Sequence, residues 1–225
     1  SKYRLSTSRK GKNQELEMFS KKLTGLAAIA GLFLLGTASA QTIVGTDHDL
    51  STVQGTGGEI CVVCHTPHNA DTTVSEAPLW NHEITAVQNF TVYASPTFDG
   101  GPSVQPGGAS KLCLSCHDGT VALDAFGGGG GTPGNVIGGG ALIGTDLSND
   151  HPISFTYDSA LATADSGLYD PTSRNSGLGG TIDADMLFAG TMECASCHDV
   201  HDNGIEPFLR LSNDASAMCL TCHNK

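Results

Sequence analysis

The chain has 225 residues, a length that fits one domain or two small ones. Aromatic residues make up 6% of it and 29 residues are glycine, so an apolar core would be thin and a staple such as disulfides, a metal or a cofactor is expected. The formal net charge of −12 excludes nucleic acid as a partner, because binding to phosphates depends on basic residues.

Residues 1–40 have the pattern of an N-terminal extension followed by a secretory signal peptide. Two lysines precede an apolar run from Leu23 to Gly36, and a small-x-small cleavage pattern ends at Ala40. The run of 14 residues is short for a membrane-spanning helix. We therefore expect export without a stable membrane anchor, with a short anchor as the alternative. The exported part would begin at Gln41, and it holds four basic residues against 21 acidic ones.

Four Cys-x-x-Cys-His motifs divide the rest of the chain. Residues 41–125 hold two of them, a Gly-rich stretch occupies 126–144, and residues 145–225 hold the other two. In chain order, motif 1 is Cys61–His65, motif 2 is Cys113–His117, motif 3 is Cys194–His198 and motif 4 is Cys219–His223. Short helices are expected at the motifs, and Pro- and Gly-rich turns with few strands are expected elsewhere.

The two halves repeat the same features in the same order. An Asp-His pair comes first (His48 and His151), and a Cys-x-x-Cys-His-x-x-His segment follows (ending at His68 and His201). A Cys-Leu-x-Cys-His motif comes last. This order predicts a duplicated two-motif module, with the Gly-rich stretch as the linker. His82 is the one histidine without a counterpart in the other half.

Cys-x-x-Cys-His is the attachment signature of c-type haem. Its cysteines form thioethers to the porphyrin, and its histidine becomes the proximal iron ligand. All eight cysteines fall in these motifs, which predicts four covalent haems c. The thioether cysteines are Cys61, Cys64, Cys113, Cys116, Cys194, Cys197, Cys219 and Cys222, and the proximal ligands are His65, His117, His198 and His223. Zinc ribbons and disulfide frameworks also use paired cysteines, but neither requires a histidine after each pair.

The second axial ligand decides between electron transfer and catalysis, because a haem closed on both faces cannot bind substrate at its iron without losing a ligand. Each module supplies two further histidines at matching places, and we predict these as distal ligands: His48, His68, His151 and His201. His82 is an alternative distal or inter-subunit ligand. The rival ligands Met186, Met192 and Met218 are expected to be packing residues. Bis-histidine ligation and the acidic surface predict low reduction potentials.

Several segments resemble the small extracellular tetrahaem c-type cytochromes of metal-reducing anaerobes, of the type of the nanowire subunit OmcE. These segments are Trp80-Asn81-His82, Tyr93-Ala94-Ser95-Pro96-Thr97, Lys111 to Gly119 and the paired motifs from 194 to 223. The resemblance implies a multihaem cytochrome c fold, mostly coil with short α-helices and few strands, organised around covalent haems. It also implies a homopolymer in which a histidine near the subunit junction, His48 first and His82 second, ligates a haem of the next subunit.

Two classes of function remain at this point. The first is electron transfer between redox partner proteins or extracellular acceptors, as a conductive filament or as a soluble periplasmic shuttle. The second is a multihaem reductase with one open haem. The Cys-x-x-Cys-Lys motif of many nitrite reductases is absent from the sequence, and an acidic surface suits anionic substrates poorly. Electron transfer, with no catalytic residue, is therefore the prediction.

Overall fold

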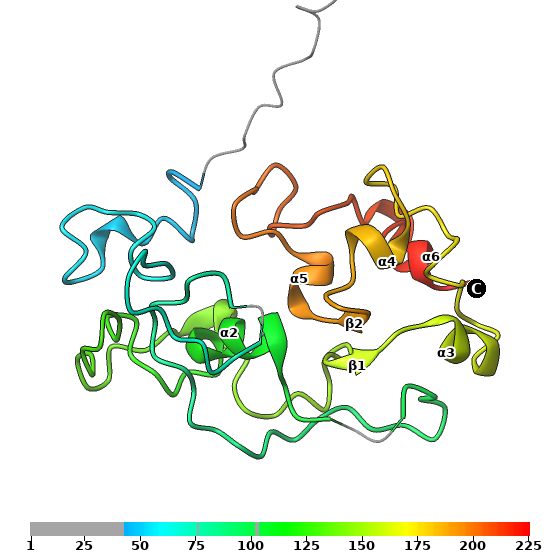
Figure 1. The fold of residues 1–225 in the computed structure, drawn as a ribbon, viewed down its shortest axis with the longest axis horizontal. Helices are drawn as coiled ribbons and strands as arrows, with labels where there is room; N and C mark the ends of the chain where they lie inside the picture. The colour runs from blue at the N-terminus through cyan, green and yellow to red at the C-terminus, as the bar shows by residue number, and fades with distance from the viewer. Residues whose placement is uncertain (1–42, 76, 102–103) are drawn as a thin grey trace, which may run out of the picture. The chain divides into compact units, whose positions relative to one another are not determined.

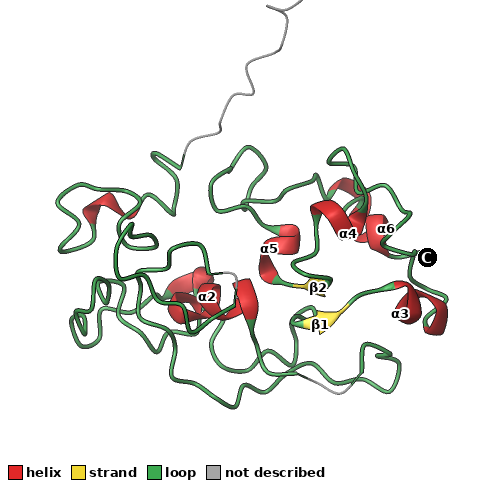
Figure 2. Cartoon of the chain, in the orientation of Figure 1, coloured by secondary structure: helices red, strands yellow, loops and turns green. Residues whose placement is uncertain are grey.

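The computed structural model describes residues 43–75, 77–101 and 104–225 (Figure 1), so the predicted signal peptide lies outside the described residues. Most of the described chain is loop and turn (Figure 2). Its α-helices and strands are α2 (Gly108–His117), β1 (Phe155–Thr156), α3 (Ser159–Ala164), α4 (Ile182–Asp185), β2 (Thr191–Met192), α5 (Cys194–Cys197) and α6 (Cys219–Cys222). Three 3-10 turns are η2 (Leu50–Thr52), η3 (Gly139–Ala141) and η4 (Asp214–Ser216). The prediction of a mostly coiled chain with short helices and few strands is confirmed.

The motifs themselves form helical turns. Motif 2 occupies the end of α2, while α5 and α6 coincide with the Cys-x-x-Cys parts of motifs 3 and 4. In motifs 1, 3 and 4 the amide of the histidine donates to the carbonyl of the first cysteine, at 2.8, 3.1 and 2.9 Å. Residues three apart share one face of such a turn, so each turn presents its two cysteines on the same side. No helix among the described residues has the length and apolar character to cross a membrane.

The largest apolar core lies in the second half of the chain. It contains Phe155, Tyr157, Leu161, Ile182, Met186, Leu187, Met192 and Cys222. β1 and β2 pair antiparallel, with Phe155 opposite Met192, and so bring two segments of this core together. Met186 and Met192 are buried there, as expected of packing residues. A second cluster contains Val74, Trp80 and Leu112, and a third contains Phe90, Leu114 and Leu147.

The third cluster joins the two halves. Leu147 packs against Phe90 and Leu114, and its amide donates to the Thr91 carbonyl at 2.6 Å. Residues 41–225 form one compact unit. The modules 41–125 and 145–225 therefore describe a repeat within that unit, and their boundaries stay a prediction.

The Gly-rich stretch is bound to the residues before it. Asp124 accepts hydrogen bonds from the Thr132 amide at 3.0 Å, from its hydroxyl at 2.6 Å and from the Asn135 side chain at 2.8 Å. Near the other end, the Ile143 amide donates to the His117 carbonyl at 2.9 Å. These hydrogen bonds fix the path of the Gly-rich stretch. The sequence did not predict this, because glycines have no side chains that would indicate a contact.

Candidate haem-binding sites

The loops that follow motifs 1 and 3 are built alike. In each, the amide directly after the motif histidine donates to the carbonyl of Leu79 or Phe208, at 2.9 and 2.8 Å. The carbonyl of the second cysteine accepts from the amide of Asn81 or Arg210, at 3.0 and 2.9 Å. Leu79 and Phe208 each follow a proline and have φ of 56° and 58°. These matching hydrogen bonds support the duplication inferred from the sequence.

Backbone carbonyls contact Nδ1 of three of the four predicted proximal histidines. The Nδ1 atoms of His65 and His198 lie 2.6 and 3.0 Å from the carbonyl of the proline in the following loop. The Nδ1 of His117 lies 2.8 Å from the Ala141 carbonyl, in the Gly-rich stretch. Because a carbonyl can only accept, Nδ1 carries the proton and Nε2 is left to bind iron. The sequence did not reveal this contribution of the Gly-rich stretch.

Three of the predicted proximal histidines lie beside a second histidine ring, and in each case that ring belongs to a predicted distal ligand. The pairs, with the distance between ring centroids, are His117 with His48 (6.0 Å), His65 with His201 (6.1 Å) and His223 with His151 (6.4 Å). Since a metal–imidazole bond is about 2 Å long, the centres of two imidazoles on one metal lie roughly 6 Å apart. These three pairs therefore fit bis-histidine haem iron at motifs 2, 1 and 4.

His48 has the properties of a ligand rather than of a surface residue. Its Nδ1 is buried and has no hydrogen-bond partner, which is unusual for a buried polar atom. Burial lowers the pKa of His48, and the neighbouring His117 lowers it further. The imidazole is therefore neutral at pH 7, the form that binds metals.

The other two paired distal histidines have Nδ1 engaged. In His201, Nδ1 lies 3.3 Å from the Asp199 carboxylate, and in His151 it lies 2.8 Å from the Pro152 carbonyl. Both contacts leave Nε2 available. Burial also lowers the pKa of His223, with a smaller contribution from His151, so this proximal ring is neutral as well.

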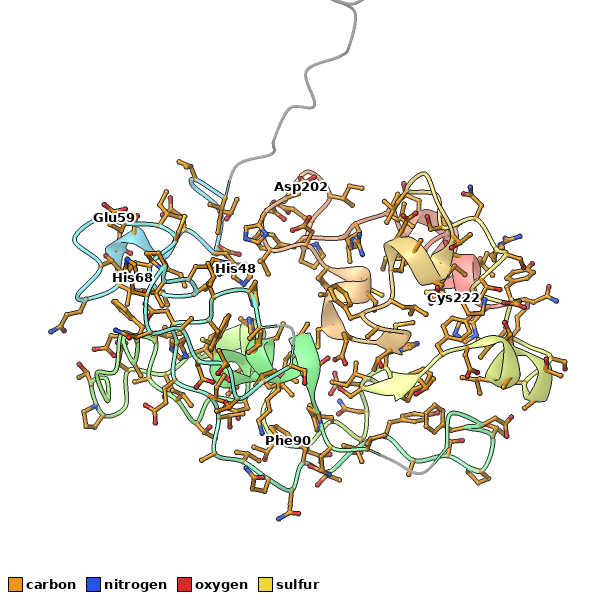
Figure 3. The ribbon with its side chains drawn as sticks, in the orientation of Figure 1. His48, Glu59, His68, Phe90, Asp202 and Cys222 are labelled. Carbon is orange, nitrogen blue, oxygen red and sulfur yellow. The ribbon has the colours of Figure 1, made fainter. Side chains whose placement is uncertain are left out.

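His68 and His198 are the predicted ligands that have no partner ring within the described part of the chain. Both are exposed, and Figure 3 shows His68 and His48 on different segments of the first half. In the repeat, His68 corresponds to His201 and His198 corresponds to His65. Since His201 of the second module lies beside His65 of the first, the equivalent pair would be His68 of the first module with His198 of the second.

His82 lies in a different environment. Its ring is 1% exposed, with Nδ1 2.9 Å from the Glu83 carbonyl and Nε2 3.0 Å from the Ala122 carbonyl. Counted from the matching hydrogen bonds of the two loops, His82 corresponds to Leu211, which packs against the largest core. In this arrangement neither nitrogen is free for iron, so its role as an alternative ligand stays a prediction that requires the ring to move.

The C-terminal part of the chain, with motifs 3 and 4, also matches a known family. Residues 188–225 match the family model of the doubled CXXCH motif. The match supports a multihaem c-type cytochrome, a class that holds haem covalently and generally transfers electrons. No curated protein matches the chain.

Cysteines of successive motifs are close enough to interact electrostatically. The pairs are Cys64 with Cys116, Cys113 with Cys194, and Cys197 with Cys222. Each motif therefore has a cysteine within electrostatic reach of the next motif along the chain. Burial raises the pKa of Cys64 to about 11 and that of Cys116 to about 12. Such neutral thiols are weak nucleophiles.

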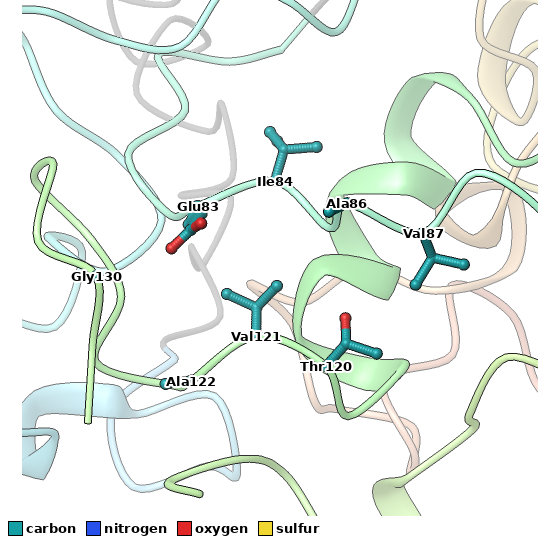
Figure 4. Close-up of a pocket in the computed structure, with 8 residues that line it drawn as sticks. All are labelled: Glu83, Ile84, Ala86, Val87, Thr120, Val121, Ala122 and Gly130. Atoms are coloured by element: carbon teal, nitrogen blue, oxygen red, sulfur yellow. The ribbon is translucent and has the colours of Figure 1, made fainter. Parts of the chain in front are cut away.

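A cavity of about 480 Å³ lies beside His82 and the segment that follows motif 2. Its lining comes from residues 83, 84, 86 and 87 and from residues 120–122, with Gly130 at one side (Figure 4). Two of the lining residues, Glu83 and Ala122, supply the carbonyls that hold His82. The lining contains no histidine or cysteine, so it offers no ligand set for iron.

Proposed function

We propose that the chain is an exported tetrahaem c-type cytochrome that transfers electrons between redox partner proteins or extracellular acceptors. The observation that carries the proposal is the pairing of three proximal histidines with three distal ones, at 6.0, 6.1 and 6.4 Å. Bound haem supplies one-electron chemistry at its iron, and histidine on both faces closes that iron to substrates.

The chain's residues orient the imidazole ligands and set the charge around the haems. Carbonyl acceptors hold Nδ1 of His65, His117 and His198, which fixes the tautomer and the direction of Nε2. The exported part has four basic residues against 21 acidic ones. This net negative charge stabilises ferric iron, which is more positive than ferrous iron, and so lowers the reduction potentials. The closeness of cysteines in successive motifs supports transfer along the motifs from one end of the chain to the other.

The test combines a haem count with a spin-state measurement on the exported protein. Intact mass should correspond to the polypeptide from Gln41 plus four haems, and electron paramagnetic resonance of the oxidised protein should show only low-spin ferric signals. A high-spin signal that accounts for one whole haem would instead favour the reductase alternative. Fewer than four haems would contradict the tetrahaem proposal.

A polymeric form is the second part of the proposal, and the unpaired histidines support it. The resemblance gave His48 as the first candidate for a ligand shared between subunits, but His48 pairs with His117 of its own chain. His68 and His198 are both exposed, so His68 is the better candidate, either for its own chain or for a second copy.

Electron microscopy of the wild type and of a His68→Ala variant distinguishes the two cases. If His68 acts across a junction, the variant loses both the filaments and one low-spin centre. If His68 acts within the chain, the low-spin centre is lost and the assembly is unchanged. Dispersed wild-type monomers under native conditions would remove the polymer and leave a soluble shuttle.

A further inference from the structure

Glu193 is a buried carboxylate at the place where motifs 2 and 3 meet. Its side chain is 4% exposed. The Oε2 atom accepts hydrogen bonds from the Ser110 amide at 3.2 Å and from the Ser154 hydroxyl at 3.1 Å. The Ser110 hydroxyl in turn accepts from the Cys194 amide at 2.9 Å. The carboxylate therefore links α2 to α5, which lie against each other (Figure 1).

Gly108 leaves the space that this carboxylate occupies. Its φ is +44°, and a Cβ at this position would lie 3.0 Å from Oε1 of Glu193. Gly108 is also the first residue of α2, a helix of ten residues. The N-terminal amides of a helix and its dipole stabilise an anion placed there. The site is thus shaped for a carboxylate in both space and charge.

Glu193 has no cationic partner in the described part of the chain, where no lysine or arginine forms an ion pair with it. Burial raises the pKa of Glu193, while hydrogen bonds from Ser110 and Ser154 lower it. The net effect raises the pKa of Glu193, and one helix amide and one hydroxyl, rather than a neighbouring cation, solvate its charged form.

The charge of this carboxylate acts on attachment points from both halves of the chain. Glu193 directly precedes Cys194, and Ser110, whose amide donates to the Glu193 carboxylate, lies three residues before Cys113 on α2. The carboxylate interacts electrostatically with both thiols. The first cysteines of motifs 2 and 3 therefore share one buried anion.

We propose that Glu193 lowers the reduction potentials of the haems held by motifs 2 and 3 as a pair. This inference rests on the proposed function, because it requires haem at both motifs. A nearby anion stabilises ferric iron, which carries one more positive charge than ferrous iron, and burial strengthens the interaction. The interaction weakens with distance, so motifs 1 and 4 are affected less.

The test is a redox titration of haem-loaded wild type and Glu193→Gln, followed by NMR with haem methyl signals assigned to each motif. Glutamine keeps the shape and one acceptor oxygen but removes the charge. The ferric-to-ferrous equilibrium at motifs 2 and 3 should shift by about tenfold toward ferrous, an increase of about 59 mV for a one-electron couple. The matched control Asp183→Asn removes an exposed carboxylate on α4 and should leave all four potentials in place.

Two further variants separate charge from structure. Gly108→Ala should displace the carboxylate and raise the same two potentials by a smaller amount, which keeps the test open if Glu193→Gln does not fold. Ser196→Ala removes the bond between the Ser196 hydroxyl and the Glu193 amide, 2.9 Å long, and should destabilise α5 without the paired shift. Equal shifts at all four motifs, or none at motifs 2 and 3, would overturn the inference while the proposed function stands. Absence of haem at either motif would overturn both.

Discussion

Replacing His48 with alanine should open one haem iron and leave the other three closed. His48 is the only ring paired with His117 in the described part of the chain, at 6.0 Å between centroids, and its Nδ1 is buried without a partner. The pairs at motifs 1 and 4 use different residues. The loss should therefore be confined to motif 2, about one quarter of the haem absorbance.

Carbon monoxide binding to the reduced protein measures this directly, because it requires an open axial position. The wild type should bind essentially none, and His48→Ala should bind about one molecule per chain. Adding His151→Ala should raise this to about two, since sites without shared partners behave additively.

The reasoning would be refuted if His48→Ala bound no carbon monoxide and stayed fully low-spin. Another residue would then be the distal ligand at motif 2. Binding of more than one molecule would show that His48 supports a second site. In either case the pairing read from the ring distances would be wrong.

Three other changes test the fold around the sites. His82→Ala should leave every haem low-spin but lower the free energy of unfolding by roughly 1–3 kcal/mol, because a buried imidazole and its hydrogen bonding to the Glu83 and Ala122 carbonyls are lost; a new high-spin haem would instead make His82 a ligand. Met186→Ala, at a side chain 1% exposed, should cost about 2–5 kcal/mol in denaturant titration through the cavity it leaves, and a cost near zero would contradict its place in the core. Hydrogen bonds from Thr132 and Asn135 lower the pKa of Asp124 to about 2, so their contribution to stability is present above pH 3.8 and lost as the pH falls through about 2. The NMR signal of the Thr132 amide should change only in that range, and a change near pH 5 would contradict the assignment.

The sequence predicted the residues of the sites better than their arrangement. The Cys-x-x-Cys-His spacing has its own chemistry, and the repeat singled out His48, His68, His151 and His201 as candidate distal ligands, which stays a prediction. Which rings meet could not be predicted, because the pairs are far apart in the chain and depend on how the loops return. The pairing of His201 with His65 across the two halves is the clearest case.

Backbone groups were the other feature that sequence reasoning missed. Backbone carbonyls orient His65, His117 and His198. The course of the backbone positions these carbonyls, so the side chains of their residues give no sign of the contact. The Gly-rich stretch has few side chains to suggest a role, yet Ala141 in it holds the proximal ligand of motif 2. Glu193, one acidic residue among many in the sequence, is set apart only by its burial beside two attachment points.

A structure of the exported protein with its haems attached is the most direct test of the central claim. We expect His48 and His117, His65 and His201, and His151 and His223 each to lie on opposite faces of one iron. A structure in which any of these pairs is divided between two haems, or in which one of those irons has an open face, would contradict it.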